Sequence, residues 1–208
     1  AKGSVLAVSE ALTNIALAPL ANGIKSISLS ANWMWPCRSQ EGEDARLYRG
    51  VEALSDFCCD LKINVPTGKD SLSMTQKYPD GTKVISPGTV IVSAGGEVSD
   101  VRKVVSPVMV NEPKSAFYHI DFSFDHLRLG GSAFAQTLNC IGDDVPTVAN
   151  PEYFAEAFEA VQQLVKALPC PTAVSEAYAQ GLDCPVFLAP TPLCRPLDPA
   201  IWPGRELW

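Results

Sequence analysis

A carboxylate and an amide four residues apart, Glu10 and Asn14, form the pair whose residue types best suit metal chemistry. Apolar residues recur at helical spacing from Ser4 to Leu20, so both side chains are expected on one helix face, one turn apart. Their oxygens are hard donors, and Mg²⁺ takes few protein ligands and completes its octahedron with phosphate oxygens and water. On spacing alone, a solvated pair on a helix surface is the commoner explanation.

A second candidate is the segment Gly68-Lys69-Asp70-Ser71, which follows the strand-like run Ile63 to Val65. It is not a P-loop, because that motif needs a glycine where Ile63 stands and a serine or threonine where Asp70 stands. Lys69 could bind a phosphate or carboxylate, and Asp70 could bind a metal or a substrate hydroxyl, or orient Lys69. A solvated turn with a local ion pair worth about 0–1 kcal/mol is an equal alternative.

Two further polar groups allow weaker hypotheses. Gly130-Gly131-Ser132 precedes a helical pattern and could hold an anion through backbone amides, although a glycine pair more often serves close packing. Asp121, Asp125 and His126 could form an acid/base cluster, but solvated loop residues explain them equally well. We assign no catalytic residue from the sequence.

The composition excludes several classes of function. Among 208 residues there are 23 acidic and 16 basic ones, a net charge of -7, and the basic residues are scattered, which argues against a nucleic-acid surface. No apolar run approaches the roughly 18 residues of a membrane span, and no signal pattern is seen, so a cytoplasmic protein is expected. Two histidines and seven cysteines, none at zinc-knuckle spacing, make a nitrogen-rich or cysteine metal site improbable.

Helices and strands alternate in the pattern up to about Val110. We expect helices over 4–20 and 43–61, strands over 26–31, 63–65 and 89–94, a turn at 78–81, and a bulge or close approach at Gly95-Gly96. A strand over 116–122 then opens a second unit, with a helix after Gly131 and another capped by Asn150-Pro151. We therefore expect one α/β domain over 1–112 and the beginning of a second over 113–168.

Residues 169–208 differ in texture from the rest of the chain. Eight of the 17 prolines lie there, spaced so that no helix or central strand could run for long. We expect an extended arm, or a segment foreign to the preceding domain. The sequence also starts at Ala1 inside an apolar pattern, which suggests a piece of a longer protein.

Five ordered motifs together resemble the large, single-chain phosphoribosylformylglycinamidine synthase family. They are Val8-Ser9-Glu10-Ala11-Leu12-Thr13-Asn14-Ile15-Ala16, Leu29-Ser30-Ala31-Asn32-Trp33-Met34, Gly42-Glu43-Asp44-Ala45, Pro66-Thr67-Gly68-Lys69-Asp70-Ser71-Leu72-Ser73-Met74 and Leu129-Gly130-Gly131-Ser132. The resemblance runs from Ala1 to about Leu168 and points to the second of the family's two synthetase halves. It implies an α+β fold: an aminoimidazole-ribonucleotide-synthase-like N-terminal domain, with a ferredoxin-like, barrel-forming sheet and helices, plus the start of the next α/β domain.

The resemblance also implies a function. The family uses ATP and glutamine to convert formylglycinamide ribonucleotide to the amidine in purine biosynthesis, releasing ADP, phosphate and glutamate. Its second half holds a nucleotide with Mg²⁺ in a largely auxiliary role, and Glu10 and Asn14 match its magnesium ligands. The implied partners are the nucleotide, the first synthetase half and a glutaminase domain. Lys69, Asp70 and Ser71 remain candidate ligand or interface contacts.

The sequence departs from the family pattern after Leu168. The family continues into a His-Asp-x-Ser-x-Gly-Gly segment that supplies another metal ligand, and residues 169–208 contain nothing like it, as a frame change or fusion would explain. We therefore expect this segment of the ligase to lack turnover by itself. The alternatives are a non-catalytic nucleotide-binding or assembly module, whose strands pair with a homologous domain, and a related ATP-dependent synthase such as aminoimidazole ribonucleotide synthase.

Overall fold

The computed structural model describes residues 1–37, 40–105, 118–126, 128–167 and 186–189, with residue 118 and residues 186–189 described by their backbone alone. The helices are α1 (Lys2–Ile15), α2 (Glu43–Leu61), α3 (Ala133–Thr137) and α4 (Pro151–Ala167), with 3₁₀ turns η1 (Gly23–Ser26) and η3 (Val101–Lys103). The strands are β1 (Ile27–Met34), β2 (Asn64–Ser71), β3 (Thr75–Lys77), β4 (Lys83–Ile85), β5 (Thr89–Gly96), β6 (Tyr118–Asp121) and β7 (Val186–Ala189).

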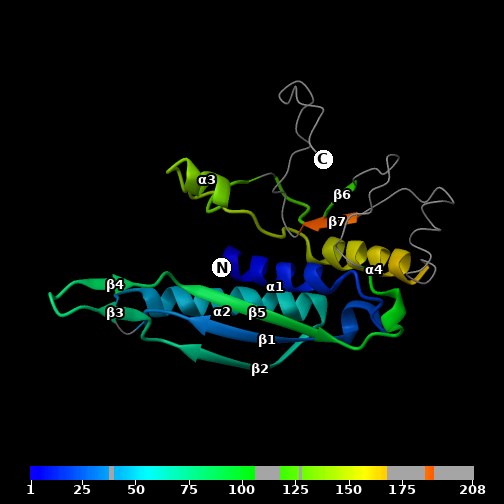
Figure 1. Cartoon of the computed structure of the whole chain (residues 1–208), viewed down its shortest axis with the longest axis horizontal. Helices are drawn as coiled ribbons and strands as arrows, with labels where there is room; N and C mark the ends of the chain where they lie inside the picture. The colour runs from blue at the N-terminus through cyan, green and yellow to red at the C-terminus, as the bar shows by residue number, and fades with distance from the viewer. Residues whose placement is uncertain (38–39, 106–117, 127, 168–185, 190–208) are drawn as a thin grey trace, which may run out of the picture.

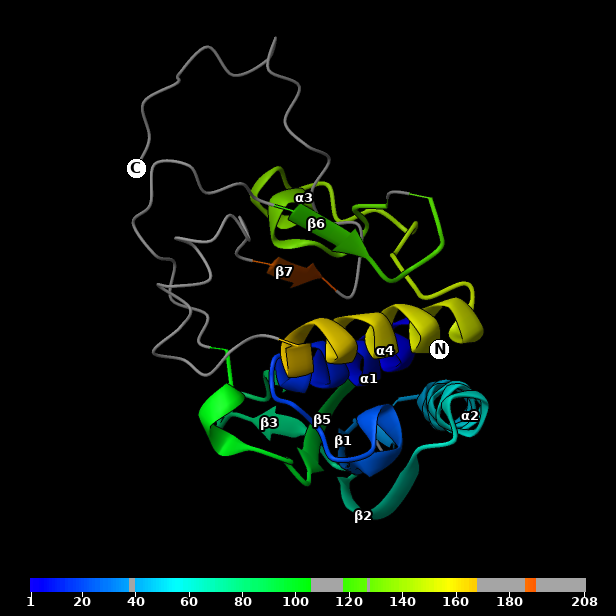
Figure 2. The same cartoon turned by 90° about the vertical axis from the view of Figure 1, so that its right-hand side faces the viewer.

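A three-stranded sheet in the order β2-β1-β5 organises the first hundred residues. Strand β1 pairs parallel with β2 and antiparallel with β5. Its residues alternate as the sequence predicts, and the side chains of Ile27, Leu29, Ala31 and Trp33 are buried. Helices α1 and α2 cover that face and leave the other one uncovered by any described element (Figures 1 and 2).

Helix α1 ends five residues earlier than the predicted 4–20, at Ile15. Pro19 disfavours helical geometry at Ala18, the residue before it. The backbone beyond the helix makes other bonds: Leu17 O accepts from Val105 N–H at 3.0 Å, and Pro19 O accepts from the Ser99 amide at 2.8 Å. Long-range pairing therefore replaces the last helical turn.

Strand β2 is longer than the predicted run from Ile63 to Val65 and takes in the Gly-Lys-Asp-Ser segment. The alternative of a solvated turn at these residues is therefore wrong. Gly68 lies directly beside Ala31 of β1, where an added Cβ would meet the Ala31 carbonyl oxygen at 2.4 Å. This close approach explains why a strand position holds glycine.

The other elements follow the pattern with small differences. Helix α2 spans the expected residues and ends at Leu61. Lys62 follows as the C-cap with a φ of 58°, and the cap bonds to the carbonyls of Cys58 and Cys59. The turn expected at 78–81 joins β3 to β4, and this hairpin projects from the sheet (Figure 1). Gly95 and Gly96 pair with β1 in unbroken register, so the expected bulge is absent there, whereas an added Cβ at Gly96 would lie 3.0 Å from Leu20.

Helix α4 packs on the α1–α2 layer, on the side away from the sheet (Figure 2). The rings of Phe154 and Phe57 meet edge to face at 5.7 Å, and Phe122 lies 5.3 Å from Phe154. Phe122, Phe154 and Phe158 are fully buried in the cluster that also contains Leu12. The predicted units 1–112 and 113–168 thus share one hydrophobic core.

Strand β7 is the described part of residues 169–208. Its backbone pairs parallel with β6, with Ala189 opposite Asp121. The predicted extended arm and the foreign origin of this segment otherwise concern residues outside the described ones. Across the described ranges, no helix has the length and apolar character that a bilayer span requires.

Candidate metal site and neighbouring polar clusters

Helix α1 presents Glu10 and Asn14 on one exposed face, as the spacing predicts. The opposite face carries Val8 and Leu12, both fully buried against the sheet and α2. Because these apolar residues fix the rotation of the helix, the carboxylate and the amide both point outward. Neither side chain makes a hydrogen bond or ion pair with another described residue.

The donor set fits Mg²⁺ as a partial site. One carboxylate and one amide oxygen, one helical turn apart, leave the remaining octahedral positions to water and phosphate oxygens, which is how magnesium commonly binds nucleotides. Among the described residues, no group of three or more His, Cys, Asp or Glu side chains gathers to hold a metal ion. Glu10 and Asn14 could therefore bind the ion only together with ligands from a nucleotide, water or another segment.

Lys69, Asp70 and Ser71 do not form one site, because neighbouring residues of β2 point to opposite faces of the sheet. Lys69 lies opposite Asn32 on the uncovered face, where its Nζ donates to Ser71 Oγ at 2.9 Å. Asp70 lies opposite Trp33 on the helix side, at a groove between β2 and α2. The three residues are exposed or half-buried at a sheet edge, and no described residue forms an ion pair with either charge.

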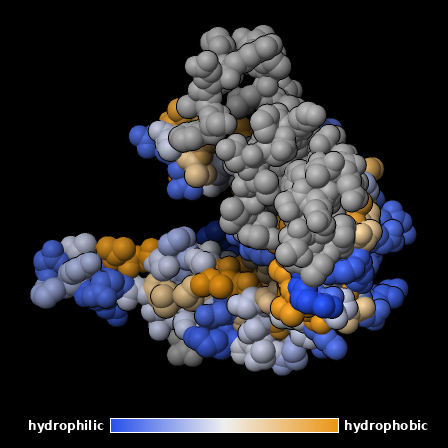
Figure 3. Space-filling view, turned by 45° about the vertical axis from the view of Figure 1, so that its right-hand side comes forward, coloured by the Kyte–Doolittle hydropathy of each residue, from blue (hydrophilic) through white to orange (hydrophobic). Residues whose placement is uncertain are grey.

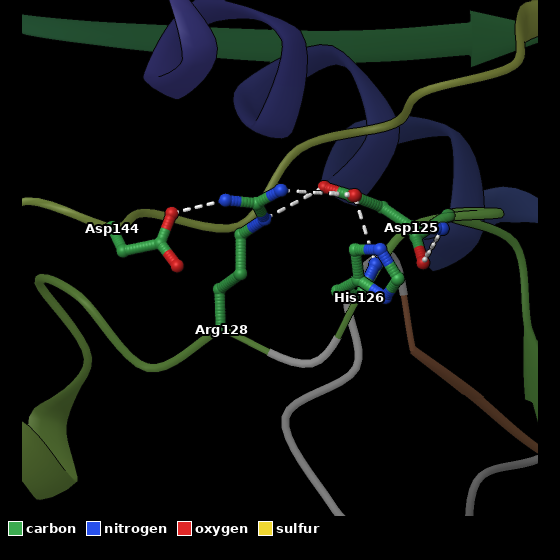
Figure 4. Close-up of polar contacts among 5 residues, drawn as sticks. Asp125, His126, Arg128 and Asp144 are labelled. Carbon is green, nitrogen blue, oxygen red and sulfur yellow. Dashed lines mark hydrogen bonds and ion pairs between the residues drawn. The ribbon is translucent and has the colours of Figure 1, made fainter.

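Asp125, a candidate for acid/base chemistry, is bound by an arginine (Figure 4). Arg128 Nε and Nη2 donate to Asp125 at 3.0 and 3.2 Å, and Arg128 Nη1 contacts Asp144. The hydrogen bond from Arg128 holds the pKa of the Asp125 carboxyl below its ordinary value. Asp121 instead accepts from the Ser123 amide at 2.7 Å, and His126 is exposed. This geometry ties two loops together and commits the Asp125 carboxylate to Arg128.

The glycine pair before α3 serves close packing, as such pairs more often do. Gly130 N–H donates to Asp144 O at 2.9 Å, and an added Cβ at Gly130 would lie 2.6 Å from the Asp144 carbonyl. Ser132 caps the helix by accepting from the Ala135 amide at 3.1 Å. The Ala135 amide in the first turn of α3 therefore already has a hydrogen-bond acceptor within the chain.

Sequence reasoning missed Gln162 on α4. It is 1% exposed, and its side chain hydrogen-bonds to the backbone beyond α1. Leu164, an apolar residue two positions later, is 57% exposed. The available signal was spacing, because Gln162 lies four residues after Phe158 and so on the buried face of the helix.

Comparison with known proteins agrees with the motifs. Residues 1–97 match the model of the FGAR-AT PurM_N-like domain. The chain is 38% identical, over 190 residues, to a protein of Caenorhabditis elegans named "Probable phosphoribosylformylglycinamidine synthase". That match takes in 90% of this chain but 14% of the relative, so the chain spans about one seventh of the relative's length.

The extent of the match bears on the proline-rich segment. The 168 residues that precede it are less than 90% of the 208-residue chain, so the match extends past Leu168. Any part of residues 169–208 that is foreign to the relative must therefore be shorter than the predicted segment.

Proposed function

Because residues 1–97 make this chain a member of the FGAR-AT PurM_N-like domain family, we propose that it supplies part of a magnesium-nucleotide site in a phosphoribosylformylglycinamidine synthase. The supporting observation is the exposure of Glu10 and Asn14 on one face of α1, inside the matched region. In this proposal the two oxygens orient Mg²⁺ toward the phosphates of ATP or ADP.

The proposed parent reaction joins nitrogen from glutamine to formylglycinamide ribonucleotide, with ATP converted to ADP and phosphate. Mg²⁺, when bound, would neutralise phosphate charge. This chain's part is to bind and orient: Glu10 supplies a negative oxygen, Asn14 supplies a neutral one, and the buried face of α1 holds both in place. The first synthetase half and the glutaminase belong to the proposed assembly as partners.

Calorimetric titration of the full chain with Mg·ADP tests this proposal. We expect Glu10→Gln to weaken Mg·ADP binding, because it removes the only formal charge of the pair. Loss of an outer-sphere partner of a metal site costs roughly tenfold to hundredfold in affinity, and the loss here should be at least as large. Asn14→Ala should weaken binding less, since it removes a neutral donor.

Glu52→Gln is the matched control, because Glu52 is an exposed glutamate on the neighbouring helix α2. Its affinity for Mg·ADP should equal that of the unmodified chain. An equal loss in Glu10→Gln and Glu52→Gln, or an unmodified chain that releases no binding heat with Mg·ADP, would refute the proposed site.

A second role, as an assembly module, is favoured by the uncovered face of the sheet. In the described part of the chain, both β2 and β5 are edge strands, and no described element lies over their shared outer face (Figures 1 and 2). Ile91 on that face is 49% exposed, and Val84 of the projecting hairpin is 55% exposed. Figure 3 shows apolar surface on the hairpin and on the body beside it. We infer that this face pairs with a homologous sheet.

A further inference from the structure

The backbone that follows α1 is held by side chains of α4, more than 130 residues away. Gln162 Nε2 donates to Ala16 O at 2.7 Å and to Ala18 O at 3.0 Å, and its Oε1 accepts from the Leu20 amide at 2.8 Å. A primary amide has two N–H groups and one carbonyl oxygen, and all of them are used here. Gln162 thus acts as a C-terminal cap for a helix to which it does not belong.

Because these hydrogen bonds are buried, losing them would be energetically costly. Gln162 is 1% exposed, and the flanking residues Ala16 and Leu20 are fully buried. Unpaired backbone groups in such a place are costly, because water cannot replace the lost hydrogen bonds. An apolar residue at position 162 would leave two carbonyls and one amide without these partners.

A second side chain of α4 holds the next turn. Glu159 Oε1 accepts from the Ile24 amide at 2.8 Å. Gly23, at φ 54°, lies beneath the carboxylate, where an added Cβ would be 2.2 Å from Oε1. Glycine is therefore required both for the left-handed backbone and for the approach of Glu159.

The residues that follow α1 are also held from the other side, by the residues that follow β5. Ala21 N–H donates to Glu97 O at 2.9 Å, and Ser99 Oγ donates to Pro19 O at 2.9 Å. The C-terminal end of α1 is therefore fixed between α4 and the residues after β5. The contact from α4 is the one nearer to the candidate metal ligands, because Gln162 bonds to Ala16, only two residues after Asn14.

We propose that Gln162 is a positioning residue for the face of α1 that carries Glu10 and Asn14. Its bonds to Ala16 and Ala18 fix where the helix ends and add to the buried residues that set its rotation, and Glu10 lies only about 9 Å along the axis from Ala16 at the helical rise of 1.5 Å per residue. This inference rests on the proposed magnesium-nucleotide site for its functional consequence, whereas the positioning of α1 stands on the contacts alone.

The test compares Gln162→Leu with Gln163→Leu in the full chain. Gln163 is the exposed neighbour on the same helix, so the control makes the same chemical change without touching α1. Residual dipolar couplings of the α1 amides measure the orientation of the helix relative to β1, hydrogen exchange measures protection of the Leu20 amide, and calorimetry measures Mg·ADP affinity. A role in stability alone would leave the couplings of the folded protein unchanged.

We expect Gln162→Leu to change the α1 couplings, to lose protection at Leu20 and to weaken Mg·ADP about tenfold, as loss of an outer-sphere partner does. Gln163→Leu should change none of these. Unchanged α1 couplings in Gln162→Leu overturn the inference. Changed couplings with a Mg·ADP affinity equal to that of the control overturn its link to the site.

Two further outcomes remain decisive. If the unmodified chain binds no Mg·ADP, the proposed site fails, and the couplings still decide whether Gln162 positions α1. If Gln162→Leu does not fold, the same measurements are made on Gln162→Met, with its unbranched side chain, in trimethylamine oxide, which favours the compact state.

Discussion

Cys58 and Cys59 are neighbours on α2 with opposite environments. Cys58 is 2% exposed and belongs to the core, whereas Cys59 is exposed. Burial, with a smaller contribution from Cys59, raises the pKa of the Cys58 thiol to about 11. Since the thiolate is the reactive form, Cys58 is an inert structural cysteine.

This contrast predicts selective alkylation of the folded chain. At pH 8 we expect iodoacetamide to modify Cys59 and Cys140 at least about a hundredfold faster than Cys58, whose thiolate fraction is suppressed by its raised pKa. As pH rises toward 11, the rate at Cys58 should increase about tenfold per unit, because each unit raises the thiolate fraction tenfold. Peptide mass spectrometry measures both rates, and equal rates at Cys58 and Cys59 at pH 8 would contradict the described burial.

The helices and the strands β1 and β5 follow from the sequence pattern, whereas most of the edge strand β2 does not. The alternation in β1 and the stripe of α4 come from burial on one face, which leaves a period in the sequence. The edge strand β2 contains Pro66, Gly68, Lys69 and Asp70, residue types that are uncommon in strands. It forms because the backbone of β1 pairs with it through hydrogen bonds. From the sequence only Ile63 to Val65 is predicted as a strand, because that partner is remote.

The residues of the candidate site also differ in whether the sequence alone could predict their contacts. Glu10 and Asn14 could be paired from the sequence because a helix brings residues four apart onto one face. Gln162 could not be linked to α1, because its partners are backbone groups about 145 residues away and carry no residue-type signal. Only the packing of α4 on α1 reveals that contact.

At the scale of elements, the uncovered sheet face predicts association. We expect the chain to self-associate at micromolar concentrations and Ile91→Asp to shift it to monomer, since a carboxylate cannot be buried unpaired between two sheets. Sedimentation velocity measures this. Val51→Asp, on α2 at 41% exposure, is the control and should leave the association unchanged. A chain that stays monomeric throughout the concentration range, or equal effects of the two substitutions, would count against the assembly role.

At the scale of the whole molecule, the buried apolar residues in the described part of the chain form one core rather than two. Phe158 of α4 and Leu29 of β1 belong to the same buried cluster, although the sequence divides them between the units 1–112 and 113–168. If this core is one cooperative unit, damage at α4 must reach the sheet.

Phe158→Ala tests this cooperativity. Deleting a fully buried phenylalanine should cost about 3–5 kcal/mol of unfolding free energy. We expect hydrogen-exchange protection to fall equally in α4 and β1. Phe134→Ala, 60% exposed on α3, should change stability by less than about 0.5 kcal/mol. Protection that falls in α4 while β1 is unaffected would show two independent domains, as the division at 112 predicts.

The central claim is that α1 holds the metal of a bound nucleotide, and paramagnetic broadening by Mn²⁺ tests it most directly. Mn²⁺ shares magnesium's preference for oxygen ligands and broadens the NMR signals of nearby groups. With ADP and substoichiometric Mn²⁺, the account predicts that the Asn14 side-chain amide signals disappear first while those of Gln163 persist. Persistence of the Asn14 signals while signals elsewhere broaden would contradict it.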